Sequence, residues 1–361
     1  MEKLYHGLAT LTIVLEKIVS VDRPIARGYN NRKGVMTMLF EKLIEKAYRS
    51  NLFIRNDNIH SIFYYSAEDF PGLHAQSYDF KGDADQSLRG YFYYYDNPIP
   101  GRLVVFDHGM GNGHRAYLRE VERLAKAGFL VYTYDHTGCM RSGGESTNGF
   151  TQSLNDLDHC ITALEAEPSL ADRKIAVMGH SWGGFSTMNI CALHPEITHV
   201  VSMSGFVSVE MILQQIMAGP MKGFRRCLFD LEARTNPDYV HFDARKSLAA
   251  TDAKVLLIYS ENDPTVHKAP HYDSLVAALS GKENIRFLLV QNKGHNPNFT
   301  EDAVVYKDTF FKEYTKAAKR KLLEKPEQQK VFMAGYDWDR MTTQDEMVWQ
   351  QIIKHLNDAD I

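Results

Sequence analysis

The strongest constraint on the fold of this chain is a regular alternation of short apolar runs and helical patterns that starts at Arg102. The runs "RLVVFD", "FLVYTYD", "KIAVMG" and "THVVSMS" are rich in Val, Ile and aromatic residues, which is typical of strands buried on both faces. Between them, apolar residues at helical spacing predict helices at about 114–127, at 154–164 and after Trp182. The alternation predicts an α/β fold with a mostly parallel central β-sheet flanked by helices on both faces.

The alternation pauses at 206–250 and then resumes. The pause contains "VEMILQQIMAGPMKGFRRCLFDLEAR", which predicts two helices interrupted at Gly219 and Pro220. The runs "KVLLIYS" and "IRFLLVQ" that follow predict two more buried strands, with a helix between them. We therefore expect 206–250 to be a helical insertion that forms a lid over the core.

Both ends of the chain extend beyond this core. Residues 1–58 are expected to be largely helical, and "IHSIFYYS" and "LRGYFYYYD" predict β structure after them. A long helix is expected over 300–325, ended by Pro326, and a last helix follows a capping-box pattern at Thr343 and Glu346. The expected division is an N-terminal helical extension (1–58), a first core part (59–205), the lid (206–250), a second core part (251–325) and a C-terminal helical extension (326–361).

Composition excludes several classes of function. The 361 residues carry a net charge of −4, which provides no basic field for a nucleic-acid backbone. One basic cluster, "KAAKRK" at 316–321, lies late in a helical run, where cations suit the helix C-terminus. None of the four cysteines forms a CxxC pair, so we expect neither metal ligation nor a dithiol redox motif. Nothing else in the sequence suggests a metal or an organic cofactor, and we expect none. The apolar segment "LATLTIVLEKIVS" is too short to span a bilayer and lacks a cleavage site, so we expect a cytoplasmic protein.

The motif "GHSWG" places Ser181 between Gly179 and Gly183, which matches G-x-S-x-G. A pattern this loose arises by chance in about one chain in ten of this length, so its context decides. Here a strand runs directly into the motif and a helix runs out of it, as a nucleophile elbow requires. The glycines would allow neighbouring chain to pass without a Cβ clash. The structural alternative is a helix N-cap serine whose glycines serve packing alone.

A nucleophilic serine needs a base, and the base needs an acid that orients it. Asp263 lies in "ENDPTV", after the strand "KVLLIYS", and His295 lies in "KGHNPN", after the strand "IRFLLVQ". Both would therefore stand at the carboxyl ends of parallel strands. The order Ser181, Asp263, His295 is the chain order expected of such a triad on this fold.

Other residues compete for these roles. Glu261 and Asp252 could be the acid, and His267 could be the base. Asp252 precedes its strand and would lie at the wrong end of the sheet, and His267 follows Asp263 too closely to occupy a separate loop. His180 adjoins the serine and is expected to point away from it.

Two backbone amides are candidates for an oxyanion hole. One belongs to Trp182, directly after the serine, and the other to Met110 in "VVFDHGMGNGH". The same loop also suggests a dinucleotide fingerprint, because "GMGNGH" lies between a strand and a helix and Asp135 ends the next strand. However, His114 replaces the third glycine of that fingerprint, and nucleotide binding leaves the serine, aspartate and histidine unexplained.

On these motifs, the chain resembles the α/β-hydrolase superfamily over about 88–325. The resemblance rests on "DHGMG", "YDHTGCMRSGGES", "GHSWGG", "ENDPTV" and "KGHNPN". The second of these is similar to a D-x-x-G-x-G-x-S loop, with Asp135, Gly138 and Ser142 roughly in place. Within the superfamily, the motif "GHSWGG" is similar to that of esterases and monoacylglycerol lipases and of S9 and S33 peptidases. Ser260 departs from the glycine that many members have before the acid loop.

The resemblance and the residues together predict a serine hydrolase that cleaves carboxylic esters of small or medium acyl chains. Two alternatives remain: a peptidase, amidase or thioesterase with the same triad, and a non-catalytic binding protein on a hydrolase fold. Met211, Met217 and Phe224 of the insertion are candidates for the substrate pocket, although they could equally form the insertion's own core. The expected partner is a small-molecule substrate, and whether the N-terminal helices cover the site, pack on the core or form a homodimer stays open.

Overall fold

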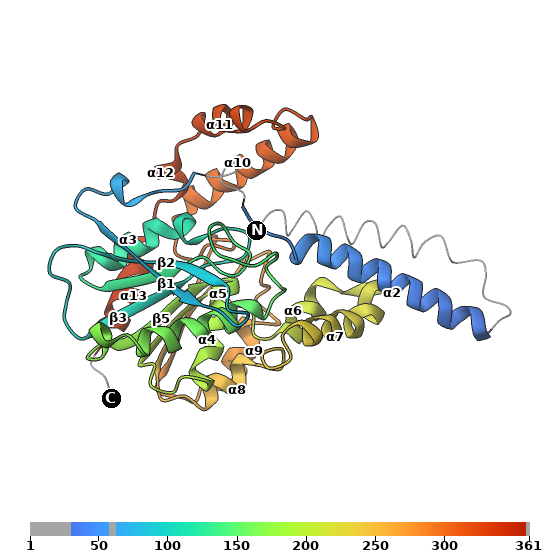
Figure 1. Cartoon of the computed structure of the whole chain (residues 1–361), viewed down its shortest axis with the longest axis horizontal. Helices are drawn as coiled ribbons and strands as arrows, with labels where there is room; N and C mark the ends of the chain where they lie inside the picture. The colour runs from blue at the N-terminus through green and yellow to red at the C-terminus, as the bar shows by residue number, and fades with distance from the viewer. Residues whose placement is uncertain (1–29, 58–62, 359–361) are drawn as a thin grey trace.

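The computed structural model describes residues 30–57 and 63–358, and Figure 1 shows their arrangement. One eight-stranded sheet forms the centre, in the order β1-β2-β4-β3-β5-β6-β7-β8. β1 and β2 are antiparallel to their neighbours, and every pairing from β4 to β8 is parallel. This confirms the predicted α/β fold. The strands are β1 (His74–Lys81), β2 (Ser87–Tyr94), β3 (Arg102–Asp107), β4 (Leu130–Tyr134), β5 (Lys174–His180), β6 (His199–Met203), β7 (Lys254–Ser260) and β8 (Ile285–Val290).

Helices cover both faces of the sheet, and each strand divides its side chains between them. On β3, Leu103 and Val105 enter the hydrophobic cluster on one face, whereas Val104 and Phe106 enter the cluster on the other. This explains why the central strands are mainly apolar. One face packs against α3 (Leu118–Lys126) and α13 (Glu346–Asn357), and the other against α4 (Gln152–Glu165), α5 (Trp182–Asn189), α8 (Ala244–Ala249) and α9 (Tyr272–Leu279).

A helical insertion follows β6, as predicted. It consists of α6 (Val209–Ile216), the 3-10 helix η5 (Gly219–Phe224) and α7 (Arg225–Thr235), so the break falls at Gly219. Arg225 stabilises this break because its guanidinium donates to the carbonyl oxygens of Met217 and Gln214, both at 2.9 Å. Arg225 therefore serves the last turn of α6.

The N-terminal helix α2 (Asn30–Leu52) lies along this insertion (Figure 1). Arg234 of α7 pairs with Glu45 at 2.9 Å, and the buried Tyr48 donates a 2.7 Å hydrogen bond to Glu232. Glu232 also accepts a 3.0 Å hydrogen bond from the backbone N–H of Phe150 in the core. One buried carboxyl group thus joins α2, the insertion and the core. Helix is confirmed for 30–52, and the earlier part of the predicted extension lies outside the described residues.

Three expectations about local structure were wrong. Residues 63–66 of "IHSIFYYS" form no strand, and β1 pairs with β2 in its place. α10 (Glu301–Lys319) ends before Pro326, which instead begins α11 (Pro326–Ala334), because proline suits the first turn of a helix. Asp345, and not Thr343, caps α13 by accepting a hydrogen bond from the backbone N–H of Val348. A short helix α12 (Trp338–Met341) precedes that cap.

No helix in 30–57 or 63–358 is both long enough and apolar enough to cross a membrane.

The junction at Glu232 predicts a pH dependence of stability. Burial raises the pKa of this carboxyl group from 4.5 to about 7, so the folded protein favours its neutral form. Its stabilising contribution is complete below pH 4.5 and is lost as the pH rises through 7. Glutamine does not titrate, so the free energy of unfolding of Glu232→Gln should rise relative to that of wild type by up to about 3 kcal/mol between pH 5 and pH 8. Urea unfolding at both pH values measures this, and an equal difference at both would contradict it.

Candidate active site

The three residues expected to form a triad stand at one edge of the sheet. Ser181 follows β5, Asp263 lies in the loop after β7, and His295 lies in the loop after β8. These strands run parallel within the order β5-β6-β7-β8, so their carboxyl ends share that edge. Asp252 precedes β7 and stands at the opposite edge, as the sequence predicted.

Ser181 lies at a sharp turn between β5 and α5. Its backbone has φ 58° and ψ −108°, a conformation with positive φ that non-glycine residues rarely adopt. Its N–H donates a 2.8 Å hydrogen bond to the carbonyl oxygen of Met203 on β6, which holds the turn against the neighbouring strand. Such strain persists only where the surrounding structure enforces it.

The flanking glycines show what enforces the turn. A Cβ on Gly179 would lie well under 3.0 Å from the backbone of Gly183, and a Cβ on Gly183 would lie as close to the backbone of Asp107. Gly184 similarly meets the backbone of Gly205. The obstructing atoms belong to backbone and cannot rotate away. The glycines of the motif are therefore required by close approach of three chain segments, as predicted.

Asp263 and His295 contact each other directly. The Asp263 Oδ2 atom lies 2.8 Å from His295 Nδ1, and both side chains are buried. The other carboxylate oxygen of Asp263 accepts from the backbone N–H groups of Thr265 at 2.7 Å and Val266 at 3.1 Å. With Nδ1–H donated to the carboxylate, His295 Nε2 carries the free lone pair. That Nε2 is buried and has no hydrogen-bond partner among the described residues.

The rival candidates lie elsewhere. His267 is exposed, and its backbone N–H donates to Gln215 of α6 at 3.0 Å. Glu261 is exposed as well. The carboxylate that contacts His295 is therefore that of Asp263, and the imidazole that contacts Asp263 is that of His295 and not that of His267.

A second histidine, His180, holds the loop that contains His295, and the sequence analysis assigned it no role. Its Nε2 lies 2.6 Å from the carbonyl oxygen of His295, and its Nδ1 lies 3.0 Å from the Tyr117 hydroxyl. Burial lowers the pKa of His180 well below its ordinary value, so the ring is neutral. It donates to His295 and accepts from Tyr117. The G-x-S-x-G pattern leaves its second position unspecified, so only the structure reveals this link.

Met110 and Trp182, the two expected oxyanion donors, follow neighbouring strands. Asp107 of β3 pairs in register with Gly179 of β5. Met110 lies three residues after Asp107, and Trp182 lies three residues after Gly179. Trp182 begins α5, where the first backbone N–H groups have no intrahelical acceptor. Its indole donates a 2.6 Å hydrogen bond to the carbonyl oxygen of Phe150.

Two buried histidines support the loops around these donors. His108 Nδ1 donates to the carbonyl oxygen of Gly109, and its Nε2 accepts from the backbone N–H of His136 at 3.1 Å. His136 lies between two carboxylates, 2.8 Å from Asp107 and 3.1 Å from Asp156, with all three side chains fully buried. Burial alone would lower the pKa of His136, but the two carboxylates raise it to about 10. A buried imidazolium thus connects β3, the loop after β4, and α4.

The loop "GMGNGH" binds a carboxylate of the protein itself. Asp135 Oδ1 accepts from the backbone N–H of His114 at 2.9 Å and lies 2.8 Å from its ring Nδ1. A Cβ on Gly113 would collide with the Asp135 carboxylate. This use of the loop argues further against the dinucleotide hypothesis.

The proposed pocket residues differ in exposure. Met217 is buried in the main hydrophobic cluster, and Met211 and Phe224 are partly buried and pack against it. Met217 therefore fits the alternative in which these residues form the insertion's own core. A pocket role for all three remains a prediction.

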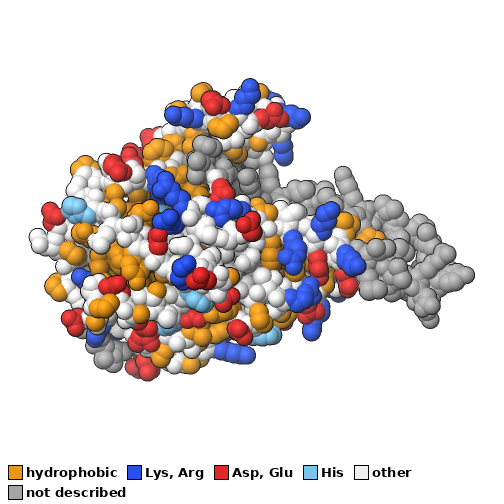
Figure 2. Space-filling model, in the orientation of Figure 1, with side chains coloured by type: hydrophobic (Ala, Val, Ile, Leu, Met, Phe, Trp, Pro, Cys, Tyr) orange, Lys and Arg blue, Asp and Glu red, His pale blue; other side chains and the backbone are white. Residues whose placement is uncertain are grey.

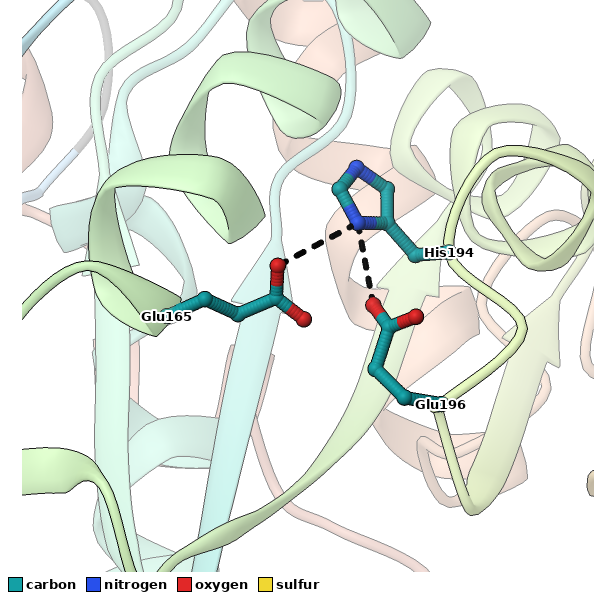
Figure 3. Close-up of side chains that lie close together, drawn as sticks. All are labelled: Glu165, His194 and Glu196. Atoms are coloured by element: carbon teal, nitrogen blue, oxygen red, sulfur yellow. Dashed lines mark hydrogen bonds and ion pairs between the residues drawn. The ribbon is translucent and has the colours of Figure 1, made fainter.

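A separate cluster lies at the opposite edge of the sheet, where Glu165 and Glu196 face His194 (Figure 3). Its oxygen and nitrogen atoms are close enough to hold a metal ion. However, His194 Nε2 lies 2.7 Å from Asp158 and Nδ1 lies 3.0 Å from Glu196, so both ring nitrogens already contact carboxylates. Burial lowers the pKa of His194, but these carboxylates outweigh it and raise the pKa. We describe the cluster as a network of ion pairs.

The parallel sheet, the strained serine turn and the carboxyl-edge loops define the class of protein, an α/β-hydrolase. Residues 98–288 match the family described as serine aminopeptidase, S33. The match covers more than half of the 361 residues, so the chain belongs to this family.

Curated relatives match shorter stretches. A monoglyceride lipase homolog of Monkeypox virus is 28% identical over 124 residues, which is 33% of this chain and 44% of the relative. A monoacylglycerol lipase of Mycolicibacterium smegmatis is 30% identical over 111 residues, 29% of this chain and 38% of the relative. A dipeptidyl peptidase family member 6 of Caenorhabditis elegans is 26% identical over 218 residues, 55% of this chain and 28% of the relative. The matched part spans less than half the length of each of these relatives.

Among solved structures, an esterase of Pyrococcus furiosus superposes with a TM-score of 0.52 at 17% identity. The superposition covers 72% of this chain and 96% of the esterase. A second crystal form of that esterase gives a TM-score of 0.53 at 16% identity. At this identity the likeness establishes the fold alone.

The close approach at the turn predicts a large effect of one methyl group. Because the added Cβ would meet the Asp107 backbone, we expect Gly183→Ala to lower the free energy of unfolding by about 3 kcal/mol or more. Gly223→Ala is the matched control, since that Cβ meets nothing within 4 Å, and it should change stability by less than about 1 kcal/mol. Urea unfolding measures both, and equal stabilities would refute the close approach.

The buried imidazolium predicts a second destabilisation. His136→Ala leaves the carboxylates of Asp107 and Asp156 buried without their cation, and we expect a loss of about 3–5 kcal/mol. Since the folded pKa is raised to about 10, this loss is complete below pH 6.5 and shrinks as the pH approaches 10. His74→Ala, which breaks an exposed pair with Asp96, should cost less than about 0.5 kcal/mol. Similar losses in both variants would contradict the assignment.

Proposed function

We propose that this protein is a serine hydrolase that cleaves carboxylic esters of small or medium acyl chains. The observation that carries the proposal is the buried Asp263–His295 contact, which leaves a partnerless imidazole nitrogen at the edge where Ser181 stands. A buried nitrogen with no partner costs free energy, and a role in a reaction explains why such a group is retained. The three residues come from separate loops, and the strands before these loops end at the same edge of the sheet, which supports a common site.

In the proposed mechanism, His295 Nε2 accepts the proton of Ser181 as the Ser181 oxygen attacks the ester carbonyl carbon. Asp263 holds the imidazole in the required tautomer and stabilises the imidazolium. The backbone N–H groups of Met110 and Trp182 stabilise the oxyanion of the tetrahedral intermediate. The imidazolium then protonates the leaving alcohol, and water releases the acyl group with His295 again as base.

Ester cleavage is preferred because the relatives include a monoglyceride lipase homolog and a monoacylglycerol lipase. The helical insertion is proposed as the lid, with Met211, Met217 and Phe224 on the acyl chain's path. Peptide cleavage is the second candidate, since the family is described as an aminopeptidase and one relative is a dipeptidyl peptidase family member. Both reactions use the same nucleophile and oxyanion donors, so the leaving group distinguishes them.

We expect wild type to react with a fluorophosphonate probe and to hydrolyse p-nitrophenyl esters, with highest kcat/KM for short to medium chains. Ser181→Ala should abolish labelling and lower kcat/KM by at least about 10⁴-fold, because the attacking oxygen is lost. His295→Gln should lower it comparably. Ser77→Ala, which removes an exposed hydroxyl from β1, is the matched control and should leave labelling and turnover unchanged.

Faster cleavage of aminoacyl p-nitroanilides than of any ester would favour the peptidase. Equal turnover of acetyl through palmitoyl esters would refute the chain-length preference. A folded wild type that neither labels nor turns over would favour a binding protein.

A further inference from the structure

The helical hairpin at 312–330 has a charge opposite to that of the whole chain. It comprises the second half of α10, the connection to α11 and the first half of α11. It contains seven Lys or Arg residues and three Glu residues, a net charge of +4 in a chain whose net charge is −4. Figure 1 shows that the hairpin projects from the core, and Figure 2 shows Lys and Arg side chains spread over it. The cations are Lys312, Lys316, Lys319, Arg320, Lys321, Lys325 and Lys330.

These cations are not tied down by ion pairs within the protein. None of the seven forms an ion pair with a carboxylate in the part of the chain that the structure describes. By contrast, cations at the base of the hairpin are paired: Arg340 binds Asp302 at 2.6 Å, and Lys293 binds Asp345 at 2.6 Å. Paired cations fix the base, and the projecting part presents unpaired positive charge to its surroundings.

Apolar side chains are exposed among these charges. Leu322, in the connection between the helices, is 55% exposed, and Val331 on α11 is 76% exposed. An aromatic core joins α10 and α11 at the base of the hairpin, where Phe310, Tyr314 and Phe332 pack together. Because that core already stabilises the hairpin, Leu322 and Val331 are not required for its folding.

This combination fits a lipid surface that carries negative charge. Anionic headgroups attract clusters of Lys and Arg, and exposed aliphatic side chains between the cations can enter the interface. A nucleic acid would be expected to use aromatic side chains as stacking platforms, but the aromatic residues here are committed to the hairpin core. The cations lie on both helices and their connection, and their excess over the three Glu residues favours an anionic partner.

The placement of the hairpin gives such docking a consequence. α10 begins six residues after His295, and Lys307 near its start donates a 2.9 Å hydrogen bond to Asn296. The 19 residues of α10 extend about 28 Å, so the cations lie away from the loop that holds His295. A contact at the hairpin would leave that loop unobstructed.

We propose that the hairpin at 312–330 docks the protein on bilayers that contain anionic lipid, through Lys319, Arg320, Lys321 and Leu322. This inference is independent of the reaction that the protein catalyses. Docking is peripheral and depends on ionic strength, because the cations remain in contact with water.

Co-sedimentation of the full chain with vesicles tests the proposal. Wild type should bind vesicles of phosphatidylcholine with 30% phosphatidylserine and not vesicles of phosphatidylcholine alone, and 0.5 M NaCl should release it. The combined variant Lys319→Gln, Arg320→Gln and Lys321→Gln should bind at least about tenfold more weakly. Leu322→Asn, with the charge unchanged, should also weaken binding.

The matched control removes the same charge elsewhere, at three exposed lysines. Lys81→Gln, Lys126→Gln and Lys354→Gln together should leave binding within about twofold of wild type. Equal binding of the two triple variants, equal binding to neutral vesicles, or no binding by wild type would each overturn the proposal. So would capture of a duplex RNA or an acidic polypeptide in preference to the vesicles. Circular dichroism of every variant separates lost docking from lost folding.

Discussion

The rest of the site depends on one steric constraint, the approach of three backbone segments without any side chain between them. Gly179 at the end of β5, Gly183 on α5 and Asp107 at the end of β3 meet so closely that a single Cβ would collide with a carbonyl. This contact bends the chain at Ser181 into its strained conformation. It also fixes the start of α5 against the end of β3, and so sets Trp182 and the Met110 loop relative to each other. Packing among glycines thus determines the position of Ser181.

Next to this contact, the protein buries the charged side chains of Asp107, His136 and Asp156, and their mutual ion pairs offset the free energy lost on removing them from water. Asp107 accepts a hydrogen bond from Ser186 of α5 and contacts the imidazolium of His136, which in turn contacts Asp156. Asp156 also accepts hydrogen bonds from the backbone and hydroxyl of Thr137. A network of this kind is weak evidence of net stability, but it leaves few alternative arrangements for the loops that it joins. We attribute the fixed position of these loops to it.

The sequence predicted the parts of the structure that depend on the spacing of apolar residues and on the residues preferred in turns. The six strands from Arg102 onward were recognisable because each contains a run of mainly apolar residues, which burial against the helices favours. The strand β1 was missed because most of its side chains are exposed, so "HAQSYDFK" has no continuous apolar run. The end of α10 was misplaced because Ala317 and Ala318 favour helix up to Lys319, and nothing before Pro326 marks the stop. Asp263 and His295 could be selected from sequence because the order of strands places their loops together.

The residues that the sequence could not assign are those that act through other side chains. His180 lies within the motif, yet its contacts are with Tyr117 of the η2 segment (His114–Tyr117) and with the backbone of His295, 115 positions away. Such contacts result from tertiary packing, and no repeating pattern in the sequence indicates them. They nevertheless connect the serine turn to the base loop in one step, because His180 immediately precedes Ser181 and holds the carbonyl oxygen of His295. A shift of either loop would therefore be transmitted to the other, so the position of His295 relative to the Ser181 turn depends on the neutral ring of His180.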